Sequence, residues 1–366
     1  MKIVFFIICW FNVSVILAQN QSQQNTSIET NFFYGKLIEH DKKIKKSIQG
    51  NPYGFTVSIN TENNKNSRFN KLFNSPIKGF TFLYENFNST VLGETYAGYR
   101  HYTYKLNSSK NSQFHLTTSF GLAYNTKPYH KINNNQNFAI GSRLLTSAIL
   151  KFSYFKLLNK EKIGIHTGLS LIHFSNFGFK NPNLGINTVA LNFGINYYLT
   201  KNKIIPKTPS SLQESTKQFI KYNLVIRGGY NESIKINSGL KPFYTLSFYG
   251  SKQLNNYSTF TSGIDYSHAT FLKKYIESIN IEKELNHNKN EFDRIGIFIG
   301  HELAQNNFSF ISQIGYTIYY PFPYISRIYE RFGFNYKLSK HIFSEISMKV
   351  NLFRAEALEI GIGYRF

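Results

Sequence analysis

Residues 113–124 read QFHLTTSFGLAY, and apolar and polar side chains alternate along most of this stretch. The residues that share the apolar face are Phe114, Leu116, Phe120, Leu122 and Tyr124. A period of two is that of a β-strand, in which successive side chains point to opposite faces. The stretch is about twice as long as a typical strand of a water-soluble protein. Its length instead matches a tilted strand that crosses a lipid bilayer.

The same alternation recurs along the chain, for example in residues 220–230, 308–318 and 358–366. Roughly 16 candidate strands can be counted, eight before residue 200 and eight after residue 219. The connections between them alternate between short polar turns, such as 159–162, and long polar loops, such as 125–137. Because lipid offers no hydrogen-bond partners, strands that span a membrane must close into a barrel. The sequence therefore predicts an all-β, antiparallel transmembrane barrel, and a water-soluble β-sandwich is the alternative.

Two arrangements of these strands remain open. Residues 191–197 (LNFGINY) resemble residues 358–364 (LEIGIGY), so the chain reads as two similar halves, 19–200 and 220–366. Residues 201–219 contain Pro206 and Pro209 and are predicted to be a linker or a long periplasmic turn. We favour one barrel of about 14–16 strands, with two tandem eight-stranded barrels as the alternative.

The N-terminus predicts export. Lys2 precedes the apolar stretch 3–17, and Ala18 is a small residue at a cleavage point, as in a Sec signal peptide over residues 1–18. A membrane anchor helix is the alternative. Cleavage would remove Cys9, the only cysteine of the chain, so the mature chain would have no disulfide and no thiolate metal ligand. The expected location is the outer membrane, which the chain would cross several times.

The net charge is strongly positive. The chain has 42 Lys and Arg residues but only 20 Asp and Glu residues, which gives a formal charge of +22. Such a charge in a cytosolic protein would indicate nucleic acid as a partner. For an exported chain, it favours an anionic surface such as a phosphorylated glycolipid, and no nucleic acid is expected. The sequence shows neither metal-ligand spacing nor a cofactor motif, so no metal and no cofactor are expected.

One predicted hairpin carries candidate catalytic residues. The apolar parity of residues 163–171 continues to His173 and Ser175, and that of residues 189–197 begins at Asn187. All three side chains are therefore expected on the lipid-facing side, near the end of the long loops. A polar side chain that faces lipid costs free energy, so its presence there suggests a function. A histidine that accepts the proton of a serine makes the hydroxyl a nucleophile. The alternative is that these residues only mark the headgroup boundary.

The string 173–186, HFSNFGFKNPNLGI, resembles the signature of the outer-membrane lipid A 3-O-deacylase family, often labelled acyloxyacyl hydrolase-like. The resemblance covers roughly the first half and is sharp only over 173–187. It implies an eight-stranded barrel that removes an ester-linked acyl chain from lipid A without a metal. It also implies that Ser175 is the nucleophile and His173 the base. The family's glutamate falls on Asn187, which can orient an imidazole but offers it no charge.

The loop that follows supplies further candidates. Asn176, Gly178 and Asn183 are expected to support a developing oxyanion, and Lys180 to pair with a lipid A phosphate. An ordinary solvated lysine is the alternative for Lys180.

The sequence thus predicts a lipid A deacylase of the carboxylic ester hydrolase class, with lipopolysaccharide of the outer leaflet as its partner. A non-catalytic barrel, as a channel or a scaffold with a degenerate site, is the second hypothesis. Whether the chain forms a homodimer stays open. In the second half, Glu345 with Lys349 and Glu359 with Arg365 share inward faces and are expected to form a paired interior network.

Overall fold

The structure is a computed structural model. It describes residues 24–63, 70, 73, 75–107, 112–158, 162–199, 219–273, 275–277, 292–305, 307–352 and 354–366. The predicted signal peptide, residues 1–18, lies outside the described residues, as does the predicted linker 201–219 apart from Phe219. Within the described part, no helix is long and apolar enough to span a membrane.

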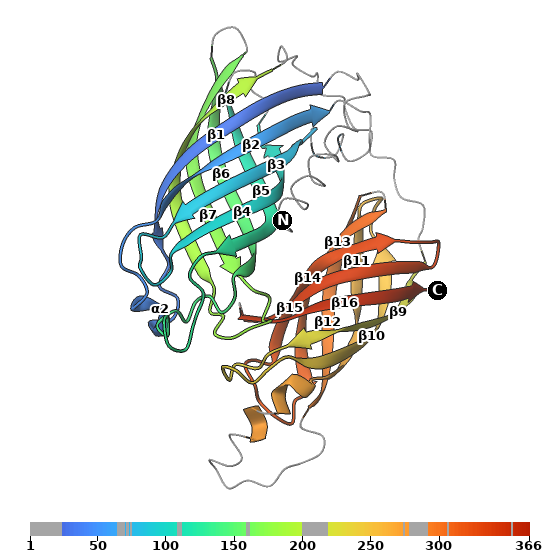
Figure 1. The fold of residues 1–366 in the computed structure, drawn as a ribbon. Coiled ribbons are helices and arrows are strands. Elements are labelled where there is room, and N and C mark those ends of the chain that lie inside the picture. Colours follow the sequence, from blue (N-terminus) through green and yellow to red (C-terminus); the bar gives the residue numbers. More distant parts are fainter. Residues whose placement is uncertain are drawn as a thin grey trace, which may run out of the picture.

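Eight antiparallel strands form a first closed barrel, here called the N-barrel (Figure 1). Each strand pairs with the next, and β8 returns to pair with β1 from Ser27↔Tyr198 to Leu37↔Thr188. The strands are β1 (Gln24–Leu37), β2 (Tyr53–Asn63), β3 (Ile77–Asn86), β4 (Glu94–Lys105), β5 (Ser112–Asn125), β6 (Leu144–Leu157), β7 (Ile163–Ser175) and β8 (Ile186–Tyr198).

Eight further strands form a second closed barrel, the C-barrel, in which β16 returns to pair with β9. The strands are β9 (Lys221–Asn231), β10 (Lys241–Gln253), β11 (Ser258–His268), β12 (Asp293–Gln305), β13 (Phe308–Tyr319), β14 (Ile328–Lys337), β15 (Ile342–Asn351) and β16 (Arg354–Arg365). Short helices lie in the connections, among them α2 (Lys42–Lys45) in the N-barrel and the 3-10 helix η3 (Thr270–Leu272) in the C-barrel.

The all-β barrel fold is confirmed, and the arrangement is the stated alternative of two tandem eight-stranded barrels. The favoured single barrel is wrong because β1 takes β8 as its second neighbour, so the first sheet closes before β9 begins. The same closure occurs between β16 and β9. A single barrel would need a pairing between strands of the two halves, and every strand edge is already used within its own half.

Both barrels present apolar side chains outward and polar ones inward. Along β8, Val189, Leu191 and Phe193 are exposed, whereas Asn192 and Asn196, of the opposite parity, are buried. The outward side chains are those expected to meet lipid, because an apolar band faces the bilayer in barrels of this type. A lumen of eight strands is only wide enough for side chains to fill.

The two ends of each barrel differ. The end at which β7 stops and β8 begins is the loop end of the N-barrel. The corresponding loop end of the C-barrel is where β11 stops and β12 begins. Buried apolar side chains close the N-barrel lumen at its loop end, among them Phe87, Leu92 and Phe174. Phe87 and Phe174 meet edge to face at 5.9 Å between ring centroids. This packing supports the end of β7 from inside the barrel.

Candidate active site

The hairpin β7–β8 joins two of the predicted site residues. His173 and Asn187 are register partners across the two strands. The His173 Nδ1 atom lies 2.8 Å from Asn187 Oδ1. Both residues share the parity of Leu171 and Val189, which are exposed on the outer face. The pair therefore lies on the outside of the N-barrel, at its loop end.

The contact with Asn187 selects one protonation form of the imidazole. An amide oxygen only accepts hydrogen bonds, so His173 Nδ1 must donate. The other ring nitrogen, Nε2, then carries a lone pair and can act as a base. The Asn187 amide nitrogen faces a second histidine, since its Nδ2 atom lies 3.5 Å from His40 Nδ1.

His40 is a member of this cluster that sequence reasoning missed. It follows β1 in an exposed connection, and its Nε2 atom lies 3.0 Å from the carbonyl oxygen of Leu184. It thereby ties the connection after β1 to the loop before β8, beside Asn187. An isolated histidine in an irregular segment has no periodicity, so no sequence pattern indicates this position.

Ser175 is the last residue of β7 and is only 5% exposed, although its parity is outward. Its register partner is Thr146 of β6, whose hydroxyl donates to the Ser175 carbonyl oxygen at 3.0 Å. Ser175 is therefore covered rather than open to lipid. Within the described residues, no hydrogen bond joins its hydroxyl to His173.

The backbone of Gly185 lies beside the side chains of both His173 and Ser175. A Cβ atom on this glycine would lie 3.2 Å from His173 Cε1 and 3.8 Å from Ser175 Cβ. Its φ of 76° is also a backbone conformation that glycine adopts readily. A side chain at this position would press on the imidazole and enter the space between His173 and Ser175.

The loop 176–185 folds through the side chains of its own asparagines. Asn183 Oδ1 accepts the backbone N–H of Asn176 at 3.0 Å, and Asn176 Oδ1 accepts that of Gly178 at 3.1 Å. Asn176 Nδ2 donates to the Lys180 carbonyl oxygen at 2.7 Å. In contrast, Asn183 Nδ2 is buried and has no hydrogen-bond partner among the residues that the structure describes. Of the predicted oxyanion groups, Asn183 thus retains an unused donor, whereas Asn176 and Gly178 use theirs to shape the loop.

Lys180 lies on the outside of the same loop. Lys180 is exposed, and its backbone carbonyl oxygen accepts a hydrogen bond from Asn176 Nδ2. The ammonium group is thus available to solvent or to an anionic headgroup.

The loop also contacts the C-barrel. The backbone N–H of Asn181 donates to Glu232 Oε2 at 2.6 Å, and Asn181 Nδ2 donates to the Ser233 carbonyl oxygen at 2.7 Å. In the opposite direction, the backbone N–H of Glu232 donates to the Gly178 carbonyl oxygen at 3.3 Å. These residues directly follow β9, so the loop end of the C-barrel meets the loop that follows β7.

Hydrogen bonds inside the N-barrel hold the hairpin β7–β8 from its lumen side. Tyr99 and Ser147 share a hydrogen bond at 2.7 Å, and the Ser147 hydroxyl donates to the His173 carbonyl oxygen at 2.7 Å. The hydroxyl of Thr188, the residue after Asn187, donates to buried Glu85 at 2.6 Å. The backbone on both sides of the His173–Asn187 pair is therefore anchored to the lumen.

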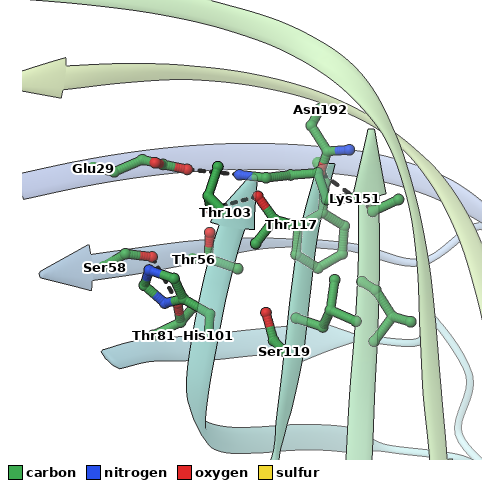
Figure 2. Close-up of a pocket in the computed structure, with 14 residues that line it drawn as sticks. Glu29, Thr56, Ser58, Thr81, His101, Thr103, Thr117, Ser119, Lys151 and Asn192 are labelled. Carbon is green, nitrogen blue, oxygen red and sulfur yellow. Dashed lines mark hydrogen bonds and ion pairs between the residues drawn. The ribbon is translucent and has the colours of Figure 1, made fainter. Parts of the chain in front are cut away.

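The lumen of the N-barrel contains a separate polar cavity (Figure 2). Glu29 and Lys151 point toward each other there and form an ion pair at 2.6 Å, and Thr81 contacts His101 at 2.8 Å. None of the predicted site residues lines this cavity. Among the residues that the structure describes, no three His, Cys, Asp or Glu side chains are grouped to hold a metal ion.

Fold and site together define a class: an outer-membrane-type β-barrel with a histidine-centred cluster on its outer surface. The family model described as "Lipid A 3-O-deacylase" matches residues 53–196. The model described as "Acyloxyacyl hydrolase, C-terminal domain" matches residues 220–366. The chain belongs to the lipid A 3-O-deacylase (acyloxyacyl hydrolase) family, and the resemblance seen in residues 173–187 is confirmed. Membership implies lipid A deacylase activity in general, lipid A as substrate and a place in the outer membrane.

The other comparisons add little. No curated protein matches the chain. Solved structures that are similar include two engineered variants of the Rh. blastica porin, which are 7% and 8% identical to the chain. Each alignment covers 94% of this chain and all of the porin, with a TM-score of 0.19.

Proposed function

We propose that the chain hydrolyses an acyl ester of lipid A through Ser175 and His173, on the lipid-facing side of the hairpin β7–β8. The observation that carries this proposal is the His173 Nδ1–Asn187 Oδ1 contact of 2.8 Å on the outer face, directly beside Ser175. It leaves His173 Nε2 unprotonated on the side of the barrel where acyl chains lie.

In the proposed reaction, His173 Nε2 takes the proton of Ser175 while the serine oxygen attacks the ester carbonyl carbon. The Asn183 amide, which has an unused buried donor, stabilises the oxyanion that develops. The sugar hydroxyl leaves with the proton from His173. Water then releases the acyl chain from Ser175 by the same steps, and Asn187 holds the imidazole throughout.

Access of the substrate requires a local movement. Ser175 is 5% exposed, so an ester that approaches from the membrane cannot reach its hydroxyl while the surrounding residues keep these positions. The loop 176–185, which begins directly after Ser175, is the segment that we expect to move. Lys180, exposed on that loop, would meet a lipid A phosphate as the substrate enters.

The competing hypothesis is a structural barrel with a degenerate site. The neutral Asn187 in the acid position favours it, as does the missing hydrogen bond between Ser175 and His173 in the described part of the chain. Catalytic hydrogen bonds are often long before substrate binds, so the geometry is compatible with both hypotheses.

The test is mass spectrometry of lipid A from cells that express the wild type, Ser175→Ala or Ser170→Ala. Ser170 lies on the same strand but faces the lumen, where its hydroxyl donates to Asn192, and it therefore serves as a matched control. The wild type and Ser170→Ala are expected to yield lipid A that lacks one hydroxyacyl chain. The proposal fails if Ser175→Ala yields the same product, or if the wild type leaves lipid A unchanged.

A further inference from the structure

The hairpin β11–β12 of the C-barrel repeats the arrangement of the site hairpin. Residues 262–270 read SGIDYSHAT and can be aligned with residues 167–175, TGLSLIHFS. The alignment places His268 on His173 and Thr270 on Ser175. Across the strands, His268 has Asp293 as its register partner, as His173 has Asn187. The position that holds a neutral amide in the N-barrel thus holds a carboxylate in the C-barrel.

The His268–Asp293 pair also lies on the same face and at the same end of its barrel as the His173–Asn187 pair. Ile264 and Tyr266 share the parity of His268 and are exposed on the outer surface, 51% and 44% respectively. His268 is the last residue of β11 and Asp293 the first of β12, so the pair lies at the loop end of the C-barrel. The strands β11 and β12 pair from Ser258↔Leu303 to His268↔Asp293. The pair therefore meets the membrane at its boundary with water.

The contacts of His268 resemble those of a catalytic histidine that a carboxylate orients. Its Nδ1 atom lies 2.6 Å from Asp293 Oδ1, and the Tyr266 hydroxyl donates to the same oxygen at 2.9 Å. The side chains of His268 and Asp293 remain 38% and 25% exposed. Within the described residues, no hydrogen bond occupies His268 Nε2. The imidazole is thus oriented by a carboxylate and open to the surface at its second nitrogen.

Two neighbours complete the cluster. Thr270 begins η3, and its hydroxyl donates to the Pro242 carbonyl oxygen, so its proton is not directed at His268. Tyr244 of β10 is the register partner of His268 on the other side and is 58% exposed. A tyrosine hydroxyl at this position can donate to an oxyanion that develops beside the imidazole. Water, rather than Thr270, is then the nucleophile that the geometry provides.

We propose that His268 and Asp293 form a second hydrolytic site, which cleaves a carboxylic ester of a lipid at the outer boundary of the membrane. His268 Nε2 takes a proton from water while the water oxygen bonds to the ester carbonyl carbon. Tyr244 donates to the resulting oxyanion. As the bond from carbon to the alcohol oxygen breaks, the imidazolium returns the proton to that oxygen, and a fatty acid and an alcohol are released. This site needs neither Ser175 nor His173.

The experiment uses the full chain with Ser175→Ala, so that the proposed N-barrel site is silent. The purified protein is reconstituted in vesicles that contain either lipopolysaccharide or phosphatidylethanolamine as the ester lipid. Released fatty acid is measured by mass spectrometry, and the band shift between unheated and heated gel samples verifies folding. Release in either kind of vesicle supports the proposal, and the vesicle identifies the alcohol that carries the ester.

Variants in the same background test the roles of the residues. His268→Gln is expected to lower the release at least about 100-fold, and Asp293→Asn about 10-fold or more. His301→Gln is the matched control, because His301 also faces outward on β12 but lies near its other end, where it contacts Ser258. It is expected to retain the release, as is Thr270→Val.

The proposal is overturned if the Ser175→Ala protein releases no more fatty acid than protein-free vesicles, or if His268→Gln releases as much as its parent. Loss of release with Thr270→Val would overturn water as the nucleophile. These results are independent of the first site, which is tested by comparing the wild type with Ser175→Ala.

Discussion

The interiors of the two barrels differ although their strand number and closure are the same. The N-barrel lumen holds mostly neutral polar side chains around two ion pairs, Glu29–Lys151 and Glu62–Lys105, and it contains a cavity (Figure 2). The C-barrel lumen is crossed by buried ion pairs, with Arg227 on Glu345 at 2.6 Å and Arg331 on Glu359 at 2.6 Å. An eight-stranded barrel can therefore be filled by either chemistry. The comparison predicts that lumen charges matter more to the C-barrel, and outer-face residues more to lipid A hydrolysis.

The largest expected effect on activity is that of His173→Gln. Glutamine keeps a polar group at this position but cannot accept the Ser175 proton, so lipid A deacylation should fall by about 10³-fold or more. Unfolding in urea should hardly change, because His173 lies outside the lumen. Mass spectrometry of lipid A and a urea titration measure the two. Normal deacylation by the variant would contradict His173 as the base.

Arg331→Met tests the opposite behaviour in the C-barrel. Arg331 is fully buried and bonds Glu359 at 2.6 Å and Asp265 at 2.8 Å. Removing it leaves two buried carboxylates without this cation, which should destabilise the C-barrel by about 3–5 kcal/mol. The urea midpoint should fall accordingly. An unchanged midpoint would show that the buried ion pairs do not stabilise this barrel.

Asn187→Glu tests whether the N-barrel site lacks a charge. A glutamate would stabilise the imidazolium that forms when His173 takes the proton, which Asn187 cannot do. Deacylation should rise by about 10-fold to 100-fold, measured as the rate of lipid A conversion in reconstituted vesicles. Asn192→Asp, a similar change on the lumen side of β8, is the control. A lower rate with Asn187→Glu would indicate that the amide is the functional group here.

Much of the fold follows from the parity of the sequence, because a period of two identifies strands and their outward faces. Parity does not tell which strand closes a sheet, so the choice between one barrel and two needed the pairing of β1 with β8. Parity likewise predicted that Glu345 and Glu359 face the lumen, but it did not predict their ion-pair partners. Glu345 bonds Arg227 and Glu359 bonds Arg331, since neighbours across a lumen are set by closure.

The site shows the same limit. Parity and the resemblance predicted the outward His173 and Asn187, and the structure brings these two into contact. The burial of Ser175 could not be predicted, because it depends on how the following loop folds. His40 and the contact of Asn181 with Glu232 could not be predicted either, since both lie in irregular segments far apart in the sequence. Local patterns carry no information on such contacts.

Lys151→Met is the N-barrel counterpart of the arginine change. Lys151 bonds Glu29 at 2.6 Å, but Asn31 also donates to this carboxylate at 2.7 Å and Asn60 at 3.2 Å. Because these amides remain, the loss should be about 1–3 kcal/mol, less than for Arg331→Met. Urea midpoints of the two variants, measured together, decide the order. A larger loss for Lys151→Met would reverse the comparison between the two lumens.

The smallest expected effect concerns the contact that joins the barrels. Glu232 accepts the backbone N–H of Asn181 at 2.6 Å through Oε2 and that of Gly239 at 3.0 Å through Oε1. Glu232→Gln replaces one acceptor oxygen by an amide donor, so one of these N–H groups loses its partner. The loop 176–185 should then be held less firmly beside Ser175.

We expect lipid A deacylation by Glu232→Gln to fall by about 3-fold to 10-fold, with little change in the urea midpoint. Glu277→Gln is the matched control, because Glu277 contacts only Lys273 at 4.0 Å among the described ion pairs and lies in another loop of the C-barrel. If both variants deacylate at the wild-type rate, the C-barrel does not position the loop. A selective loss in Glu232→Gln would show that an outer-face site on one barrel depends on the loop end of the other.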